Sequence, residues 1–174
     1  MTESYYSSSG RRSDGPGVPA VDAQGDVRVR HARPADAREW AALRHALWPD
    51  EPESELLAEA EGFFTAADAR LMAVLLAEKS ADGLVGFAEL SLRAYAEDCR
   101  TSPVAFLEGW YVMPSVRQQG VGRALMRAAE HWARRRGCRE FASDTPAENT
   151  VSAAAHLALG FDDAGVLRCF RKTL

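Results

Sequence analysis

The feature that most constrains this chain is a pair of glycines that opens an amphipathic helix directly after an apolar strand. Gly120 and Gly122 lie in the run RQQGVGR at residues 117–123, between an expected strand at Val104–Val112 and an expected helix at Val121–Arg136. Glycine allows a ligand to approach the backbone, and a helix N-terminus presents unpaired N–H groups at the positive end of its dipole. The pattern predicts a pyrophosphate site. The alternative is a capped helix whose glycines only shape a turn.

Two other glycine-rich phosphate motifs do not fit. A Walker A loop requires Lys-Ser or Lys-Thr directly after its last glycine, whereas Arg123 and Ala124 follow Gly122. A dinucleotide-binding fingerprint requires G-x-G-x-x-G with an acidic residue about twenty positions later. Only the first G-x-G is present here. The sequence therefore excludes both of these nucleotide-binding motifs.

Hydrophobic periodicity predicts an α/β (α+β) domain of three layers around a mixed sheet. Strands are expected at Val27–Arg30, Leu71–Leu76, Leu84–Leu92, Val104–Val112, Phe141–Asp144 and Val166–Lys172. Helices are expected from Pro34 to the stop at Pro49, from a cap at Ser54, at Val121–Arg136, and from Glu148 to Leu159. This order mixes hairpins with strand–helix–strand crossovers.

The N-terminal stretch differs from the rest of the chain. Residues 1–26 contain five Ser, four Gly and two Pro, with few large aliphatic side chains. Such a segment buries too little apolar surface to offset its conformational entropy. We expect a disordered tail over residues 1–26 and a single domain over residues 27–174.

The composition of the chain argues against several classes of partner, namely nucleic acids, metals and membranes. The net charge of -4 argues against a nucleic-acid partner. Three cysteines without a CxxC pair, and four histidines without metal-ligand spacing, predict reduced thiols and no metal site. Because no apolar run is long enough for a bilayer and no signal-peptide pattern follows Met1, we expect a cytoplasmic protein without a membrane partner.

Charge is distributed unevenly along the chain. From Arg117 to Arg139 inclusive there are seven Arg and one acid. The basic run 134–136 either meets ligand phosphates or forms a solvated helix end. Seven acids and no Lys or Arg lie between Arg44 and Arg70: Asp50, Glu51, Glu53, Glu55, Glu59, Glu61 and Asp68. These form either a surface that attracts a polycation or an ordinary solvated face.

The stretch Glu108–Leu125 resembles motif A of the GNAT N-acetyltransferases, in which a strand, a proline-containing turn and [RQ]-x-x-G-x-[GA] lead into a helix. The resemblance implies the GNAT fold: a central mixed, largely antiparallel sheet flanked by helices, with a splayed strand pair holding acetyl-CoA. It also implies backbone contacts to the acetyl-CoA pyrophosphate and pantetheine arm, from Trp110, Tyr111, Val112, Gln118, Gln119, Gly120, Val121, Gly122 and Arg123. Asn149, which begins a helix ending in Leu159-Gly160-Phe161, would contact the pantetheine arm.

A narrower resemblance covers residues 27–174. Blocks such as LWP at 47–49, FLEG at 106–109, GCRE at 137–140 and ASDT at 142–145 are similar to aminoglycoside 6'-N-acetyltransferases. The resemblance implies an aminoglycoside substrate and a homodimer. It places Trp48 against the sugar ring, with Glu51 and Tyr95 near it, and assigns Glu108 and Asp144 to its amines. Independently, a carboxylate inside the apolar run Phe106–Val112 must be paired or face a ligand.

The expected reaction is direct attack of an acceptor amine on the thioester in a ternary complex, followed by loss of the thiolate. Because an ammonium cannot attack, a carboxylate or an ordered water chain must take its proton. Asp144 is the first candidate, and Glu108 acting through water is the second. His156 takes the place of a Tyr that acts as general acid in many GNAT enzymes, either in that role or as a structural residue. Gly165 lies where relatives often carry a carboxylate.

Two other functions remain open on the sequence alone. A GNAT enzyme for another amine, such as a polyamine or a protein N-terminus, would bind the same donor but turn over no aminoglycoside. A non-catalytic acyl-CoA sensor would bind the donor and transfer nothing. Titration with both substrates and a thiol-release assay separate the three possibilities.

Overall fold

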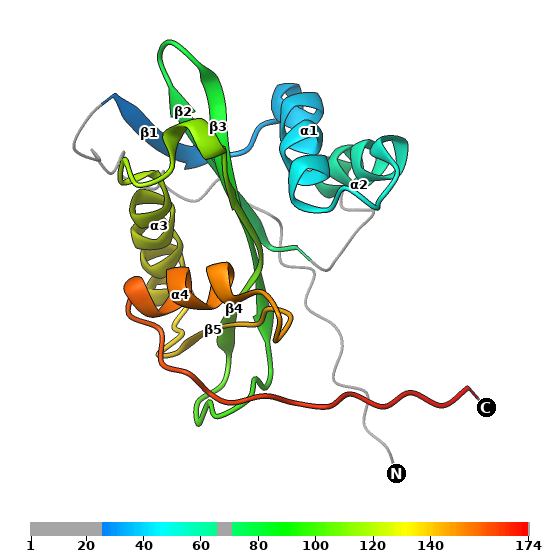
Figure 1. Cartoon of the computed structure of the whole chain (residues 1–174), viewed down its shortest axis with the longest axis vertical. Helices are drawn as coiled ribbons and strands as arrows, with labels where there is room; N and C mark the ends of the chain where they lie inside the picture. Colours follow the sequence, from blue (N-terminus) through cyan, green and yellow to red (C-terminus); the bar gives the residue numbers. More distant parts are fainter. Residues whose placement is uncertain (1–25, 66–70, 174) are drawn as a thin grey trace.

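A computed structural model describes residues 26–65 and 71–173 (Figure 1). Its elements, in chain order, are β1 (Val27–His31), the 3-10 turn η1 (Pro34–Asp36), α1 (Ala37–Leu47), α2 (Glu53–Thr65), β2 (Ala73–Lys79), β3 (Gly83–Arg93), β4 (Val104–Val112), η2 (Pro114–Val116), α3 (Val121–Arg135), β5 (Phe141–Ser143) and α4 (Thr150–Ala158). In the described ranges, no helix is both long and apolar enough to cross a bilayer.

The strands form one mixed sheet in the order β1-β2-β3-β4-β5. The first four strands pair antiparallel, whereas β4 and β5 are parallel. The β3–β4 ladder shifts by one residue, because Glu89 pairs with Gly109 and Leu90 pairs with Leu107. Glu108 is therefore the extra residue of a β-bulge, which bends a strand and increases its twist.

The helices cover the two faces of this sheet (Figure 1). α3 packs against the face that presents Val29, Leu75 and Leu90, and its own Leu125 and Ala129 complete this larger core. α1 and α2 cover the opposite face, where Trp40 packs with Leu76 and Phe87. The expected three-layer domain with a mixed, largely antiparallel sheet is thus confirmed.

Two predictions about element boundaries are wrong. Val166–Lys172 is not a strand: it is exposed, makes no pairing within the described part of the chain, and extends away from the domain in Figure 1. An alternating pattern allows a segment to form a strand, but the segment must also find another strand to pair with. The edge strand β5 has only three residues, so it offers little backbone for such pairing. Ser54 does not cap α2 either, because the helix begins at Glu53 and Ser54 lies in its first turn.

The expectation of a disordered tail at residues 1–26 falls outside the described residues, apart from Asp26. The Asp26 carboxylate accepts a hydrogen bond of 3.0 Å from the Ser80 hydroxyl. Asp26 is therefore in contact with the turn between β2 and β3.

Candidate active site

The strands β4 and β5 separate at the centre of the sheet. They pair only from Ala105 to Leu107, so the edge of β4 that faces β5 is open from Glu108 to Val112. An open strand edge presents backbone N–H and C=O groups to any ligand that can extend the sheet. The splayed strand pair expected from the sequence is present.

The glycine loop lies beyond the end of β4. Gln118 and Gly120 both have left-handed backbone conformations, with φ of +61° and +85°. The first intrahelical hydrogen bond of α3 joins the Ala124 amide to the Gly120 carbonyl at 2.9 Å, which leaves the preceding amides of the first turn without helical partners. A side chain at Gly120 would meet no other atom within 4 Å. The turn is therefore an open cradle of N–H groups that suits an anion.

Trp110 joins this loop to the splay. A Cβ atom on Gly122 would lie 2.8 Å from the Trp110 ring, so glycine is required for the ring to rest against the first turn of α3. The Trp110 ring meets His156 of α4 edge to face, with centroids 5.6 Å apart. Its buried Nε1 has no hydrogen-bond partner among the described residues. An unpaired buried donor beside an open strand edge points to a missing acceptor.

His156 and Asn149 belong to α4. The Asn149 side chain caps this helix by accepting a hydrogen bond of 3.0 Å from the Ser152 amide. His156 donates from Nδ1 to the Ser152 carbonyl at 2.8 Å, and its Nε2 lies 3.1 Å from the Ser143 hydroxyl. His156 therefore contacts both β5 and Trp110, whereas Asn149 is exposed at the start of α4.

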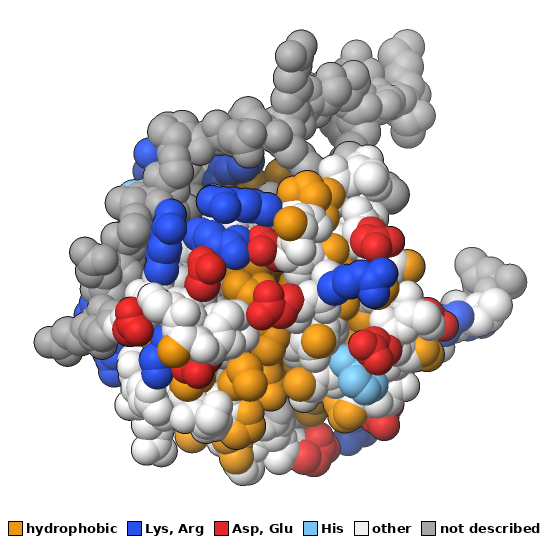
Figure 2. All heavy atoms as spheres, turned by 90° about the horizontal axis from the view of Figure 1, so that it is seen from above, with side chains coloured by type: hydrophobic (Ala, Val, Ile, Leu, Met, Phe, Trp, Pro, Cys, Tyr) orange, Lys and Arg blue, Asp and Glu red, His pale blue; other side chains and the backbone are white. Residues whose placement is uncertain are grey.

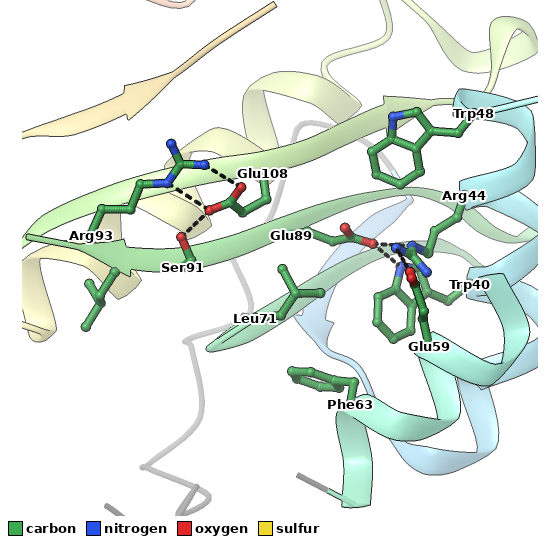
Figure 3. A pocket seen from close by; sticks show the side chains of 11 residues that line it. Trp40, Arg44, Trp48, Glu59, Phe63, Leu71, Glu89, Ser91, Arg93 and Glu108 are labelled. Carbon is green, nitrogen blue, oxygen red and sulfur yellow. Dashed lines mark hydrogen bonds and ion pairs between the residues drawn. The ribbon is translucent and has the colours of Figure 1, made fainter. Parts of the chain in front are cut away.

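A second cavity, of about 500 Å³, opens on the other face of the sheet between α1, α2, β3 and β4. Trp48 and Glu108, two of the residues predicted to contact the acceptor, both line it (Figure 3). The Trp48 ring lies above Gly109, where a Cβ atom would be 2.7 Å from it. The Arg44 guanidinium holds the other side of this ring at 5.2 Å from its centroid. Trp48 is therefore a fixed wall of the cavity.

Glu108 is held by three donors. Arg93 Nη2 lies 2.7 Å from Oε2 and Arg93 Nε lies 3.1 Å from Oε1, which also accepts a short hydrogen bond from the Ser91 hydroxyl. The carboxylate in the apolar run is thus paired and also faces a cavity. It can orient a cationic group, but its oxygens are already engaged.

Glu89 lies at the floor of this cavity and is the more deeply buried carboxylate. Its Oε1 accepts a hydrogen bond of 3.0 Å from Trp40 Nε1 and lies 2.9 Å from Arg44 Nε in an ion pair. Arg44 in turn contacts Glu59 at 2.8 Å. Burial raises the pKa of Glu89 to about 7, although the Arg44 charge and the Trp40 hydrogen bond oppose this rise.

The raised pKa of Glu89 predicts a pH dependence of stability. The folded state holds this proton up to about pH 7, whereas the unfolded state releases it near 4.5, so stability should decrease as pH rises between these values. Hydrogen bonds from Arg30 and Thr101 lower the pKa values of Asp36 and Glu140, respectively. Titration of these two carboxyl groups therefore affects stability only at lower pH. Thermal unfolding from pH 4.5 to 8 should show this decline in the wild type and not in Glu89→Gln. Parallel curves for the two proteins would contradict the prediction.

The other predicted acceptor contacts do not line the cavity. Glu51 and Tyr95 are exposed at the loops after α1 and β3, and Asp144 is exposed directly after β5. Of the acids expected to attract a polycation, Glu59 lines the cavity and is paired, and Asp68 lies outside the described residues. On the face seen in Figure 2, acidic and basic side chains are interspersed around an apolar strip.

The basic run at the end of α3 makes local contacts. Arg134 pairs with Glu130 at 2.8 Å, and Arg136 lies over the Trp132 ring. Across the 15 residues of α3, a rise of about 1.5 Å per residue separates this run from Gly120. These contacts favour the solvated-helix-end interpretation for Arg134 and Arg136.

Comparison with known proteins decides the family. The family model described as Acetyltransferase (GNAT) family matches residues 37–161. The chain belongs to the GNAT acetyltransferase family. The aminoglycoside N(6')-acetyltransferase type 1 of Klebsiella aerogenes is 53% identical over 146 residues, which cover 84% of this chain and 96% of that protein. Its counterpart in Stenotrophomonas maltophilia is 47% identical over 152 residues, covering 84% of this chain and 93% of that protein.

Solved structures of such enzymes share the fold of this acetyltransferase. AAC(6')-Iy in complex with the bisubstrate analog CoA-S-monomethyl-acetylneamine is 39% identical, with a TM-score of 0.77, over 86% of this chain and all of that one. AAC(6')-Iy in complex with CoA is 37% identical, with a TM-score of 0.79, over 88% and 99% of the two chains.

The residues of this acetyltransferase fit a CoA donor. The open cradle at Gly120 suits the pyrophosphate, the free edge of β4 suits the amides of the pantetheine arm, and the unpaired Trp110 Nε1 offers one further donor. Within the described residues, no group of three or more His, Cys, Asp and Glu side chains is placed to hold a metal ion.

Sequence reasoning missed the buried group at the floor of the acceptor-side cavity. Glu89 interrupts the apolar run Leu84–Leu92 in the same way as Glu108 interrupts Phe106–Val112. The rule that singled out Glu108 applies equally to Glu89. Its partner Arg44 gave no such signal, because it lies on a helix where arginine is common.

Proposed function

We propose that the protein transfers the acetyl group of acetyl-CoA to the 6'-amino group of aminoglycoside antibiotics. The observation that carries this proposal is the meeting of two sites at Gly109: the anion cradle and free edge of β4 on one side, and a cavity with a tryptophan and carboxylates on the other. The relatives named above are aminoglycoside N(6')-acetyltransferases. Acetylation removes a positive charge from a polycation that binds RNA largely through charge, so resistance would follow.

In this proposal the donor binds along β4 and the start of α3. Backbone groups of Trp110, Tyr111 and Val112 pair with the pantetheine arm, and amides from Gln118 to Arg123 hold the pyrophosphate. Val121 is buried, so its contribution is limited to its backbone. Arg117 supports this arrangement by donating from Nε to the Val112 carbonyl at 3.0 Å. Asn149 approaches the arm from α4.

The acceptor enters the cavity beneath Trp48. Its sugar ring packs on Trp48, and its ammonium groups meet Glu108 inside the cavity. We assign Glu51, Tyr95 and Asp144, which are exposed and do not line the cavity, to the rim of the acceptor site. Rings presenting hydroxyl and ammonium groups suit such a wall, because an aromatic face attracts cations and C–H groups. The charges of Glu108 and Arg93 nearly cancel, so the rim carboxylates supply the net attraction.

The reaction is direct attack on the thioester. A backbone amide of β4 next to the bulge stabilises the oxyanion. Asp144, and Glu108 acting through water, are the acceptors of the amine proton that the sequence suggests. His156 protonates the leaving thiolate. Its neighbour Ser143, 3.1 Å away, can relay a proton between β5 and α4.

The decisive test combines binding and turnover. Acetyl-CoA and kanamycin are titrated separately by calorimetry, and thiol release is then measured with both present. Thiol release that depends on kanamycin supports the proposal. Release only with polyamines or peptides would indicate another amine as substrate, and donor binding without any release would indicate an acyl-CoA sensor.

We further propose a homodimer in the cytoplasm. Val166 and Phe170 are 81% and 88% exposed, and they lie in the C-terminal segment, whose strand pattern has no partner among residues 26–65 and 71–173. The edge of β5 is open, so the same segment of a second copy has a surface to pair with. The cytoplasm supplies acetyl-CoA and keeps Cys99, Cys138 and Cys169 reduced.

The dimer proposal predicts the effect of charged substitutions in this segment. A Val166→Glu, Phe170→Glu double variant should shift the mass in light scattering from dimer to monomer, because two buried apolar contacts become charged. Arg171→Glu, on the same segment but on the opposite face of such a strand, is the matched control and should keep the dimer. A wild-type protein that is monomeric at micromolar concentration would contradict the proposal.

A further inference from the structure

Glu89 occupies a position that the proposed chemistry needs and that the sequence did not assign. It pairs directly with Gly109 across the β3–β4 ladder, at the bulge where β4 turns from β5 to its open edge. Its Oε1 is engaged by Trp40 and Arg44. Among the described residues, its Oε2 makes no hydrogen bond or ion pair, and it is directed away from Trp40 and Arg44, toward the space below Trp48 (Figure 3).

Gly109 allows this carboxylate and the Trp48 ring to lie close to the backbone of β4. A Cβ atom at position 109 would lie 3.3 Å from Glu89 Oε2 and 2.7 Å from the Trp48 ring. Without a side chain there, an amine that enters beneath Trp48 can reach both Glu89 and the edge of β4. Among the described carboxylates that line the cavity, Glu89 alone combines an oxygen without a hydrogen bond or ion pair with this closeness to the Gly109 backbone.

The competing carboxylates are less suited to accept a proton. Both oxygens of Glu108 already accept hydrogen bonds from Arg93 or Ser91. Glu59 is bound to Arg44 at 2.8 Å on the solvent side. Asp144 is exposed beyond β5 and does not line the cavity.

We propose that Glu89 is the proton acceptor that converts the acceptor's ammonium group into the attacking amine. This inference rests on the proposed function. The N–H proton passes to Glu89 Oε2, and the freed electron pair forms the C–N bond with the thioester carbonyl carbon. The C–S bond then breaks, its electron pair leaves with the sulfur, and the second proton of the nitrogen passes through His156 to that thiolate. Glu89 releases its proton to solvent after the products leave.

The surroundings of Glu89 fit this task. Arg44 of α1 and Glu59 of α2 lie on one side, and Arg93 of β3 and Glu108 of β4 lie on the other, so each cation is already matched by a carboxylate. Burial raises the pKa of Glu89 to about 7. A base is most effective when its pKa lies near the working pH.

The test is the pH profile of kcat/KM for kanamycin at saturating acetyl-CoA. In the wild type, kcat/KM should rise through about pH 7 as Glu89 ionises. Glu89→Gln should lose this rise and fall by roughly 100-fold at pH 7, the usual contribution of a general base. Its deficit should shrink at about pH 9.5, where the amine loses its proton without help. A structural defect would not be repaired by raising the pH.

Two further variants provide the controls. Glu59→Gln removes the same type of group from the other side of Arg44; it should keep the rise but move it to lower pH, because the Glu59 charge raises the pKa of Glu89. Glu89→Asp keeps a carboxylate and should keep part of the rise. CoA binding by calorimetry should be the same in all of them, which shows that the donor site is intact.

Distinct results overturn the inference and the proposed function. A rise near pH 7 that persists in Glu89→Gln, or that disappears in Asp144→Asn instead, would overturn the role of Glu89 alone. A wild type that releases no thiol with any aminoglycoside would overturn the proposed function and this inference with it.

Discussion

A Gly120→Val variant is expected to bind CoA at least about 100-fold more weakly than the wild type while remaining folded. Valine is strongly disfavoured at the φ of +85° that Gly120 adopts, so the turn must change its backbone conformation. That change redirects the amides of the first turn of α3. Losing two hydrogen bonds to a charged group costs about 1.5–3 kcal/mol each. Calorimetric titration with CoA measures the effect directly.

Gly137 at the other end of α3 provides a matched control. Its φ is +80°, and, as at Gly120, an added Cβ atom would meet nothing within 4 Å. Gly137→Val therefore imposes a similar backbone strain, of about 1–3 kcal/mol, far from the splay. It should lower the melting temperature as Gly120→Val does, but leave CoA affinity unchanged. Equal loss of affinity in both variants would show that strain alone, and not the cradle, explains the result.

The cradle could be predicted from sequence because its determinants are local. The strand Val104–Val112, the glycines at 120 and 122 and the apolar stripe of α3 are adjacent in the chain. Each of these patterns predicts one local structure. The apolar run predicts a strand, the glycines a close approach to the backbone, and the stripe a helix that packs on one face. The structure reproduces the predicted bounds of this strand to the residue, and those of the helix to within one residue. Local pattern was sufficient here.

The acceptor cavity depends on contacts that no local pattern contains. Arg44 and Glu89 are 45 residues apart in the sequence, yet they form one ion pair under Trp48. Burial of Glu89 follows from the packing of α1 and α2 onto β3, and its raised pKa follows from that burial. The strand prediction for Val166–Lys172 is wrong for the converse reason. Its side chains alternate as in a strand, but no strand among the described residues pairs with it. In both cases the local sequence is compatible with more than one structure, and tertiary packing determines which structure forms.

A Gly109→Val variant is expected to lose aminoglycoside turnover by at least about 100-fold while binding CoA normally. The Cβ atom alone would lie 2.7 Å from the Trp48 ring and 3.3 Å from Glu89 Oε2, so the valine methyl groups must displace Trp48 and cover the carboxylate. The acceptor then loses its contact surface on Trp48 and its access to Glu89 Oε2. Overpacking of this kind costs about 1–3 kcal/mol of stability, which should leave the protein folded.

The measurement is kcat/KM for kanamycin together with the dissociation constant for CoA. Gly109→Ala should be intermediate, because it adds only the Cβ atom and so displaces the Trp48 ring less than valine does. In the Gly109→Val background, Trp48→Ala should cost less activity than it does in the wild type, since both changes remove the same wall. Gly120→Val gives the opposite pattern, with donor binding lost and the acceptor cavity intact. If Gly109→Val weakened CoA binding as much as Gly120→Val does, the two substrates would not enter from opposite faces of β4, and the separation of donor and acceptor sites at Gly109 would be wrong.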